Sequence, residues 1–135
     1  MAKTAPNPLV VLIVDDEEPM RRMERRILEE AGCQVLEAPD GLTAIALLEN
    51  NTPLDLVVSD LEMPGLLGDE MVRRIRAKRP DLKVLFVTGH VDRLFEEQSQ
   101  LWDGQAFLEK PFTGPGLLEA ISLLLYGTTA FKGRR

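Results

Sequence analysis

The amino-acid sequence predicts an α/β fold, a doubly wound parallel sheet of five strands with five helices. Short runs rich in Val, Ile, Leu and Phe alternate along the chain with longer segments of helical periodicity. This alternation is typical of βαβ units, which build parallel sheets. The short runs are apolar at nearly every position, as expected of strands that are buried on both faces. We therefore expect one domain in which helices cover both faces of the sheet.

The five expected strands are these short apolar runs, and the clearest of them are VVLIVDD, LDLVVSD and VLFVTG. Each of these three runs ends at polar residues, which mark the carboxyl end of the strand. The strands are expected at residues 9–14, 34–38, 54–59, 83–88 and 106–109.

The first expected helix spans residues 18–31 and ends before Gly32, a residue type that commonly terminates helices. Apolar residues at helical spacing define the face that we expect to be buried: Met20, Met23, Ile27, Leu28 and Ala31. The charged residues define a face that we expect to be solvated and to form local ion pairs: Arg21, Arg22, Glu24, Arg25, Arg26, Glu29 and Glu30. A docking surface for a partner helix is the alternative interpretation of this charged face.

The other helices are expected at residues 41–50, 68–79, 91–101 and 115–125. Pro80 closes the third helix, and Thr113–Gly114–Pro115 is a typical start for the last one. The apolar residues at helical spacing are Leu42, Ile45, Ala46 and Leu48 in the second helix, Met71, Val72 and Ile75 in the third, Val91, Leu94, Phe95, Leu101 and Trp102 in or beside the fourth, and Leu117, Leu118, Ile121 and Leu125 in the last.

The bulk composition fits a single globular domain. The 135 residues are 44% hydrophobic and 28% charged, both ordinary values, and can bury one core. No apolar run approaches the roughly 20 residues of a membrane span, and the first residues lack the apolar centre of a secretory signal. The net charge of −6 argues against a nucleic-acid-binding surface, which needs concentrated positive charge. We expect a cytoplasmic protein that binds neither membrane nor nucleic acid directly.

The two ends of the chain and its one cysteine carry no functional signal. Residues 1–8 and 126–135 lack periodicity, so we expect a flexible leader and a tail around a domain at residues 9–125. Cys33 has no cysteine neighbour and no metal-ligand spacing, so we expect a packed thiol beside the second strand.

Polar residues at the strand ends predict a functional site. Asp15, Asp16, Asp60, Thr88 and Lys110 each lie at the last residue of an expected strand or just beyond it. The carboxyl ends of parallel strands share one edge of the sheet, where such folds bind ligands. Like charges about 4 Å apart repel by roughly 4 kcal/mol at an effective dielectric near 20, so clustered aspartates require a cation. The sequence therefore predicts a site for a hard metal ion that handles phosphate.

Four segments carry a resemblance to a known family: VDDEEPMRR, SDLEMPGLLGDE, VTGH and AFLEKPF. In this order and spacing they make the chain resemble the receiver domain of response regulators in two-component signalling, over nearly all of residues 9–125. The segment before AFLEKPF makes it more similar to receivers of hybrid histidine kinases, and a single-domain regulator is the other possibility. The resemblance implies a flavodoxin-like sheet with the strand order 2-1-3-4-5.

The same resemblance implies a chemistry for the site. Asp60 would be the phosphoacceptor, receiving a phosphoryl group from a histidine kinase or a histidine phosphotransfer protein. Asp15, Asp16, Asp60 and the backbone carbonyl of Glu62 would bind Mg²⁺, with Asp15 acting mostly through water. Lys110 and Thr88 would contact the phosphoryl group, and the Lys110–Pro111 bond is usually cis in the family.

The resemblance also implies how a signal would leave the site. Phosphorylation would draw the Thr88 hydroxyl inward and let the Phe107 ring rotate. This change would alter the face formed by the fourth helix, fifth strand and fifth helix, which would bind a downstream protein. A plain core aromatic is the alternative role for Phe107. Glu62 and His90 occupy positions that would set the lifetime of the phosphorylated state, although an exposed loop histidine without such a role is the other interpretation of His90.

Two competing functions fit parts of the pattern. A phosphatase of the haloacid-dehalogenase type also forms an aspartyl phosphate, but it needs an Asp two residues after the nucleophile, where this chain has Glu62. A degenerate receiver used only for binding would leave an intact site unused. We expect a signalling receiver that catalyses only its own phosphorylation and dephosphorylation, rather than an enzyme that turns over a substrate.

Overall fold

The computed structural model describes residues 8–63, 65–89 and 105–127, and within them it confirms the expected class of fold. Five parallel strands form one sheet in the order β2-β1-β3-β4-β5. The strands are β1 Val10–Val14, β2 Gln34–Ala38, β3 Leu56–Asp60, β4 Lys83–Thr88 and β5 Gln105–Glu109. The strand order that the resemblance implied is therefore confirmed.

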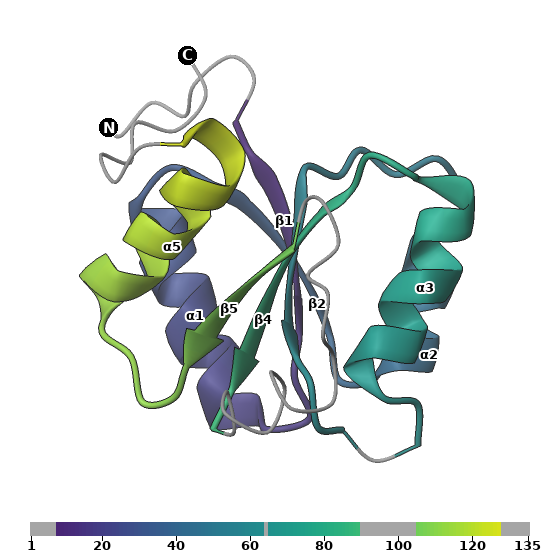
Figure 1. The fold of residues 1–135 in the computed structure, drawn as a ribbon, viewed down its shortest axis with the longest axis horizontal. Coiled ribbons are helices and arrows are strands. Elements are labelled where there is room, and N and C mark those ends of the chain that lie inside the picture. Colours follow the sequence, from purple (N-terminus) through teal and green to yellow (C-terminus); the bar gives the residue numbers. More distant parts are fainter. Residues whose placement is uncertain (1–7, 64, 90–104, 128–135) are drawn as a thin grey trace.

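Helices cover both faces of this sheet. The described helices are α1 Glu18–Glu30, α2 Gly41–Leu47, α3 Gly68–Lys78 and α5 Gly114–Tyr126. Helices α1 and α5 pack on one face, and α2 and α3 pack on the other (Figure 1). The helix that the sequence predicts at residues 91–101 falls outside the described residues, as does Trp102.

The core consists of two apolar layers, one on each face of the sheet. Side chains such as Leu12, Val57 and Phe86 face α2 and α3, whereas their neighbours Ile13 and Val58 face α1 and α5. Successive strand residues point to opposite faces, so only strands that are apolar at every position can fill both layers. This arrangement explains why the strand segments lack strict alternation of polar and apolar residues.

The predicted buried face of α1 is wrong at two positions. Glu24, which we expected in solvent, is only 2% exposed, whereas Met23 is 39% exposed. The buried side chains of the helix are Glu24 and Leu28, which lie four residues apart on one stripe. The helix is therefore rotated by about one residue from the orientation that apolar residues alone favour, and the carboxyl group of Glu24 faces the protein interior.

The predicted buried face of α2 is wrong at Leu42 and Ala46 but confirmed at Leu48, and Ile45 is half-buried against the core. Leu42 is 62% exposed and Ala46 is exposed, whereas Gly41, Ala44 and Leu48 are buried. A Cβ atom on Gly41 would lie only 3.1 Å from Leu66 Cδ2, so a small residue is needed where α2 approaches the loop before α3. Close packing thus favours small residues, Gly41 and Ala44, in the first part of the buried stripe, while the large Leu42 lies outside.

The packed thiol that we predicted at Cys33 is confirmed. Cys33 is 7% exposed and belongs to the layer between the sheet and helices α1 and α5. Burial, followed by the negative charge of Asp55, raises the pKa of the thiol to about 11. The thiol is thus held in its neutral, unreactive form at physiological pH.

We expect Cys33 in the folded protein to react with a thiol reagent at pH 7–8 at least about tenfold more slowly than in the urea-unfolded chain, because both burial and the raised pKa deplete accessible thiolate. Absorbance of the released chromophore gives both rates. Equal rates in the two states would show that the thiol is open to solvent.

No helix in the described ranges has the length and hydropathy needed to cross a lipid bilayer.

Candidate functional site

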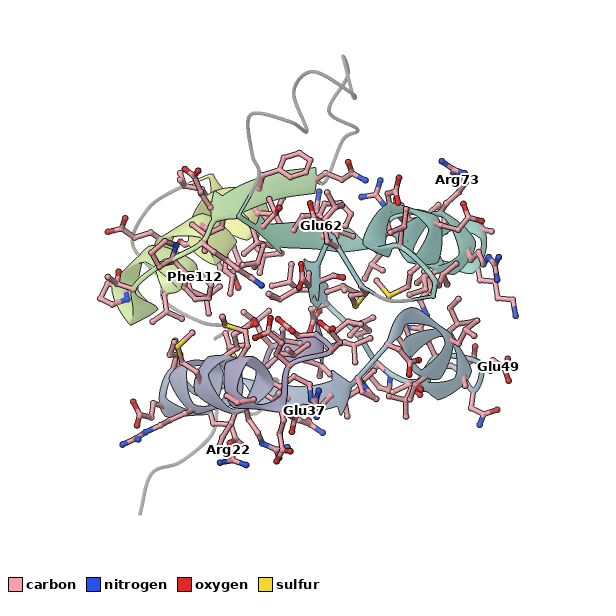
Figure 2. The ribbon with its side chains drawn as sticks, turned by 90° about the horizontal axis from the view of Figure 1, so that it is seen from below. Arg22, Glu37, Glu49, Glu62, Arg73 and Phe112 are labelled. Carbon is pink, nitrogen blue, oxygen red and sulfur yellow. The ribbon has the colours of Figure 1, made fainter. Side chains whose placement is uncertain are left out.

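The polar residues predicted at the strand ends do meet at the carboxyl edge of the sheet. Asp15 and Asp16 follow β1, and Asp60 and Thr88 are the last residues of β3 and β4. Carboxylate oxygens of Asp15, Asp16 and Asp60 all lie within 4.8 Å of one another. Figure 2 looks onto this edge, with Glu62 near the centre of the view. The sheet topology therefore gathers three acidic groups that are up to 45 residues apart in the chain.

Lys110 brings a positive charge to the three carboxylates. Its Nζ atom lies 3.3 Å from Asp60 Oδ2 and 3.8 Å from Asp15 Oδ2. Its backbone N–H donates to the carbonyl oxygen of Thr88 at 2.8 Å, which ties the end of β5 to the end of β4. The Lys110–Pro111 bond is cis, as the resemblance implied. Burial disfavours the ammonium, but Asp60 and then Asp15 outweigh it, so the pKa of Lys110 is raised.

Asp60 is held with both carboxylate oxygens engaged. The residue is 7% exposed, and its Oδ1 accepts a hydrogen bond from the Glu62 N–H at 3.1 Å. Its Oδ2 faces Lys110. Just behind it, the first residue of α3, Gly68, approaches so closely that a Cβ atom there would lie 2.6 Å from the Asp60 carbonyl oxygen. The Asp60 side chain is therefore held by the Glu62 N–H and by Lys110, while Gly68 crowds its backbone carbonyl.

Asp15 is the most deeply buried acid of the cluster, at 1% exposure. Its Oδ1 accepts a hydrogen bond from the Glu17 N–H at 2.9 Å, whereas its Oδ2 is buried and has no hydrogen-bond partner among the described residues. Burial raises the pKa of Asp15, and the like charges of Asp60 and Asp16 add to this effect, while the Glu17 N–H and Lys110 oppose it.

This set of oxygens could hold a divalent cation. Three carboxylates face one ammonium, so the cluster carries excess negative charge. A buried carboxylate oxygen without a partner is costly, and Asp15 Oδ2 is such an atom. Hard cations such as Mg²⁺ take oxygen ligands from one or two carboxylates and keep several waters. The donor set thus matches Mg²⁺ in charge and in chemistry.

Thr88 and Phe107 lie on the two strands beside the cluster. Thr88 is buried at the end of β4, and Phe107 is half-buried on β5. The Phe107 ring stacks on Phe86, its direct neighbour across the strand pair, with a centroid distance of 5.5 Å and an interplanar angle of 22°. Glu62 is exposed, and His90 lies outside the described residues.

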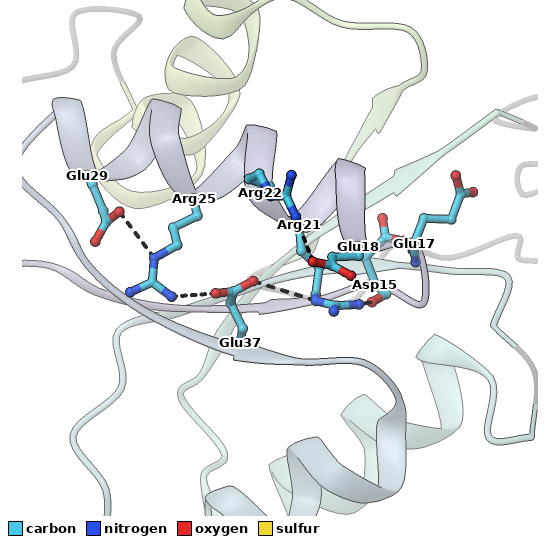
Figure 3. Close-up of polar contacts among 8 residues, drawn as sticks. All are labelled: Asp15, Glu17, Glu18, Arg21, Arg22, Arg25, Glu29 and Glu37. Atoms are coloured by element: carbon cyan, nitrogen blue, oxygen red, sulfur yellow. Dashed lines mark hydrogen bonds and ion pairs between the residues drawn. The ribbon is translucent and has the colours of Figure 1, made fainter.

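Helix α1 supplies a contact to the site that the sequence did not predict. Arg21, which we expected on the solvated face, donates from Nη1 to the backbone carbonyl of Asp15 at 2.7 Å. Figure 3 shows that Glu37 on β2 links this arginine to Arg25, which also pairs with Glu29 at 3.1 Å. The solvated ion pairs expected on α1 are present, but Arg21 also fastens the chain at Asp15.

Comparisons with known proteins agree with this arrangement. The family model described as "Response regulator receiver domain" matches residues 11–122, which include every residue of the cluster. The chain is 38% identical to "Response regulator MprA" of Mycobacterium sp. (strain KMS) over 127 residues, 93% of this chain and 54% of that protein. It is 34% identical to "Sensor kinase CckA" of Brucella abortus (strain 2308) over 116 residues, 85% of this chain and 12% of that protein.

A solved structure gives the same picture. The chemotaxis protein CheY4 of Vibrio cholerae superposes with a TM-score of 0.80 at 28% sequence identity, covering 88% of this chain and all of that one. The chain thus spans about half of MprA and a small part of CckA, whereas it matches the full length of the CheY4 chain.

Proposed function

The chain belongs to the response-regulator receiver family of two-component signalling, and on this premise we propose that it accepts a phosphoryl group on Asp60, with Mg²⁺, from a histidine kinase or a histidine phosphotransfer protein. One observation carries the proposal. The carboxylates of Asp15, Asp16 and Asp60 and the ammonium of Lys110 converge at one edge of the sheet. No other cluster of three metal-binding side chains occurs among the described residues.

The proposed reaction is a nucleophilic substitution at phosphorus. A carboxylate oxygen of Asp60 attacks the phosphorus of a phosphohistidine and forms a P–O bond, while the P–N bond breaks and its electron pair returns to the imidazole. Asp15, Asp16, Asp60 and the Glu62 carbonyl would hold Mg²⁺, which when bound offsets the negative charge of the transferred group. The hydrogen bond from the Glu62 N–H orients Asp60 for the attack.

Lys110 and Thr88 would hold the phosphoryl group after transfer. Lys110 Nζ already lies 3.3 Å from Asp60 Oδ2, so it is placed to bind a phosphoryl oxygen attached to this side chain. Thr88 ends the neighbouring strand at the same edge and would supply a hydroxyl donor. Both contacts exist only in the phosphorylated state and therefore bias the protein toward the conformation in which they form.

Phe107 would carry the change to the protein surface. In the present structure its ring is half-buried against Phe86. Moving a two-state equilibrium from 1:99 to 99:1 takes about 5.5 kcal/mol of differential stabilisation, which charge-assisted bonds to Thr88, Lys110 and backbone amides can supply. The face that would respond includes β5 and α5. The resemblance adds the helix that the sequence predicts at residues 91–101, which lies outside the described residues, and the partner of this face would be a downstream protein. Glu62 and His90 would tune how long the phosphorylated state lasts.

The proposal is tested by incubating the chain with a small phosphoryl donor, acetyl phosphate, with and without Mg²⁺, and recording intact mass. We expect one added phosphoryl group per chain, in the presence of Mg²⁺ only, that is released in alkali as an aspartyl phosphate should be. Failure to gain mass at saturating donor would contradict the proposal. Continuous turnover of a phosphomonoester would instead favour the phosphatase, in which the residue two after the nucleophile must be an acid–base Asp.

A further inference from the structure

Glu24 on α1 has an environment that the proposed reaction does not explain. The side chain is 2% exposed, and its Oε2 is buried without a hydrogen-bond partner in the described part of the chain. A buried acceptor with no partner costs free energy, and an ionised carboxylate costs more than a neutral one. An apolar residue at this point would pack without that cost. A bound donor or cation that contacts this carboxyl group would offset the cost of burying it.

The charged groups that act on Glu24 belong to the phosphoacceptor site. They are Asp15 after β1, Asp60 at the end of β3 and Lys110 after β5. Burial and then the charge of Asp15 raise the pKa of Glu24 to about 8. Arg21, which donates to the Asp15 carbonyl, lies three residues earlier on α1 and thus on the same side of the helix (Figure 3). Helix α1 therefore buries Glu24 where the charges of the acid cluster still act on it.

Two buried oxygen atoms of the described residues lack hydrogen-bond partners, Glu24 Oε2 and Asp15 Oδ2, although Lys110 Nζ lies 3.8 Å from the latter. The negative charge of Asp15 acts on the Glu24 carboxyl group, so a partner shared by the two oxygens must be a hydrogen-bond donor or a cation. Mg²⁺ in proteins keeps several of its waters, and each bound water has O–H groups to donate. Carboxylates in the outer shell of a metal site accept such hydrogen bonds and orient the inner ligands.

We propose that Glu24 is an outer ligand of the cation site, accepting a hydrogen bond from a water that the cation holds on the side of Asp15. The proposal rests on the proposed function, because it assumes the divalent cation at Asp15, Asp16 and Asp60. It gives Glu24 a role as a positioning residue rather than a catalytic one. Its consequence is that the buried acid is unfavourable in the metal-free protein and favourable once the cation is bound.

The test compares Mg²⁺ affinity, measured by isothermal titration calorimetry, with the thermal unfolding of metal-free protein. Glu24→Gln and the apolar variant Glu24→Leu are both expected to bind Mg²⁺ about tenfold more weakly, at the lower end of typical outer-shell effects. Glu24→Leu is also expected to unfold at a higher temperature than wild type without metal. Glu30→Gln is the matched control, because it makes the same substitution at an exposed position of the same helix.

For Glu24→Leu, the Mg²⁺ affinity must fall while the unfolding temperature of the metal-free protein rises. A purely structural role for Glu24 would not produce this combination. Equal Mg²⁺ affinities for Glu24→Gln, Glu24→Leu and Glu30→Gln would overturn the proposal. Asp16→Asn tests the cation site separately from the role of Glu24. Loss of Mg²⁺ binding in Asp16→Asn would support the cation site even if the Glu24 variants bind Mg²⁺ as wild type does. A wild-type chain that binds no Mg²⁺ would refute the cation site and the outer ligand together.

Discussion

Asn in place of Asp60 is expected to abolish the Mg²⁺-dependent gain of a phosphoryl group. The Asn side chain has the same shape as Asp, so its oxygen can still accept the hydrogen bond that Asp60 Oδ1 receives from the Glu62 N–H. The amide lacks the anionic oxygen that attacks phosphorus and cannot form an acyl phosphate. Asp60→Asn should therefore remove the chemistry while leaving the surrounding backbone in place. Intact mass after incubation with acetyl phosphate provides the measurement.

The fold of Asp60→Asn is expected to stay intact, which separates lost chemistry from lost structure. The substitution removes the ion pair with Lys110, 3.3 Å away, but it also removes repulsion from Asp15 and Asp16. Like charges about 4 Å apart repel by roughly 4 kcal/mol at an effective dielectric near 20, which is comparable to the attraction lost. Thermal unfolding without Mg²⁺ should thus occur within a few degrees of wild type.

Asp81→Asn serves as the control for this variant. Asp81 is exposed and precedes β4, so it lies at the edge of the sheet opposite the acid cluster. This variant should gain the phosphoryl group as wild type does. If Asp60→Asn were modified to the same extent, the acceptor would have to be another carboxylate of the site, and Asp16, the exposed member, would be the next to test.

The strands could be predicted closely because strands buried on both faces are apolar at nearly every position, and such short apolar runs stand out in the sequence. Two strands begin and end at the predicted residues, and the others differ by no more than two residues at either end. The largest difference is at β3, which starts at Leu56 rather than at Leu54. Asp55 there turns its side chain to the backbone N–H of Val10, so the residues before Leu56 connect to β1 without joining the sheet as a strand.

The helix faces could not be predicted as well, because apolarity is only one of the forces that orient a helix. On α2 the close approach of Leu66 and Met71 favours the small Gly41 on the buried side, and Leu42 lies outside. On α1 Arg21 contacts the Asp15 carbonyl, and Glu24, three residues later, is buried. Both orientations depend on contacts between elements, which helical periodicity within one segment does not contain.

The site shows the same contrast between strand residues, which could be predicted, and helix residues, which could not. Asp15, Asp16, Asp60, Thr88 and Lys110 could be found from the sequence because parallel strands must end at a common edge, whatever the details of packing. Arg21 and Glu24 reach the region from the side of a helix, and their placement depends on its rotation. The backbone crowding at Gly68 was also invisible in the sequence, since a glycine in a loop first suggests turn geometry.

Ala in place of Gly68 is expected to damage both stability and phosphoryl transfer. The added Cβ would lie 2.6 Å from the Asp60 carbonyl oxygen and 3.1 Å from Leu61 Cα, and backbone atoms cannot move aside cheaply. Overpacking of this kind costs about 1–3 kcal/mol. The strain falls on the backbone of Asp60 itself, and a misplacement of about 1 Å at a reacting group can slow a reaction roughly 10²-fold. Urea unfolding and the rate of mass gain with acetyl phosphate measure the two effects.

Gly114→Ala provides a control with the same substitution at the same helical position. Gly114 begins α5 as Gly68 begins α3, but its added Cβ would meet only the Ile27 side chain, at 3.6 Å or more. This contact is an ordinary one, so Gly114→Ala should be neutral or more stable by about 0.4–1 kcal/mol through the unfolded state. Similar stabilities and similar rates of phosphoryl gain for the two variants would mean that the backbone between β3 and α3 can shift at little cost to accommodate the added Cβ. A defect confined to Gly68→Ala would support the conclusion that the close approach of α3 holds Asp60 in position, because only at Gly68 does the added Cβ meet backbone atoms.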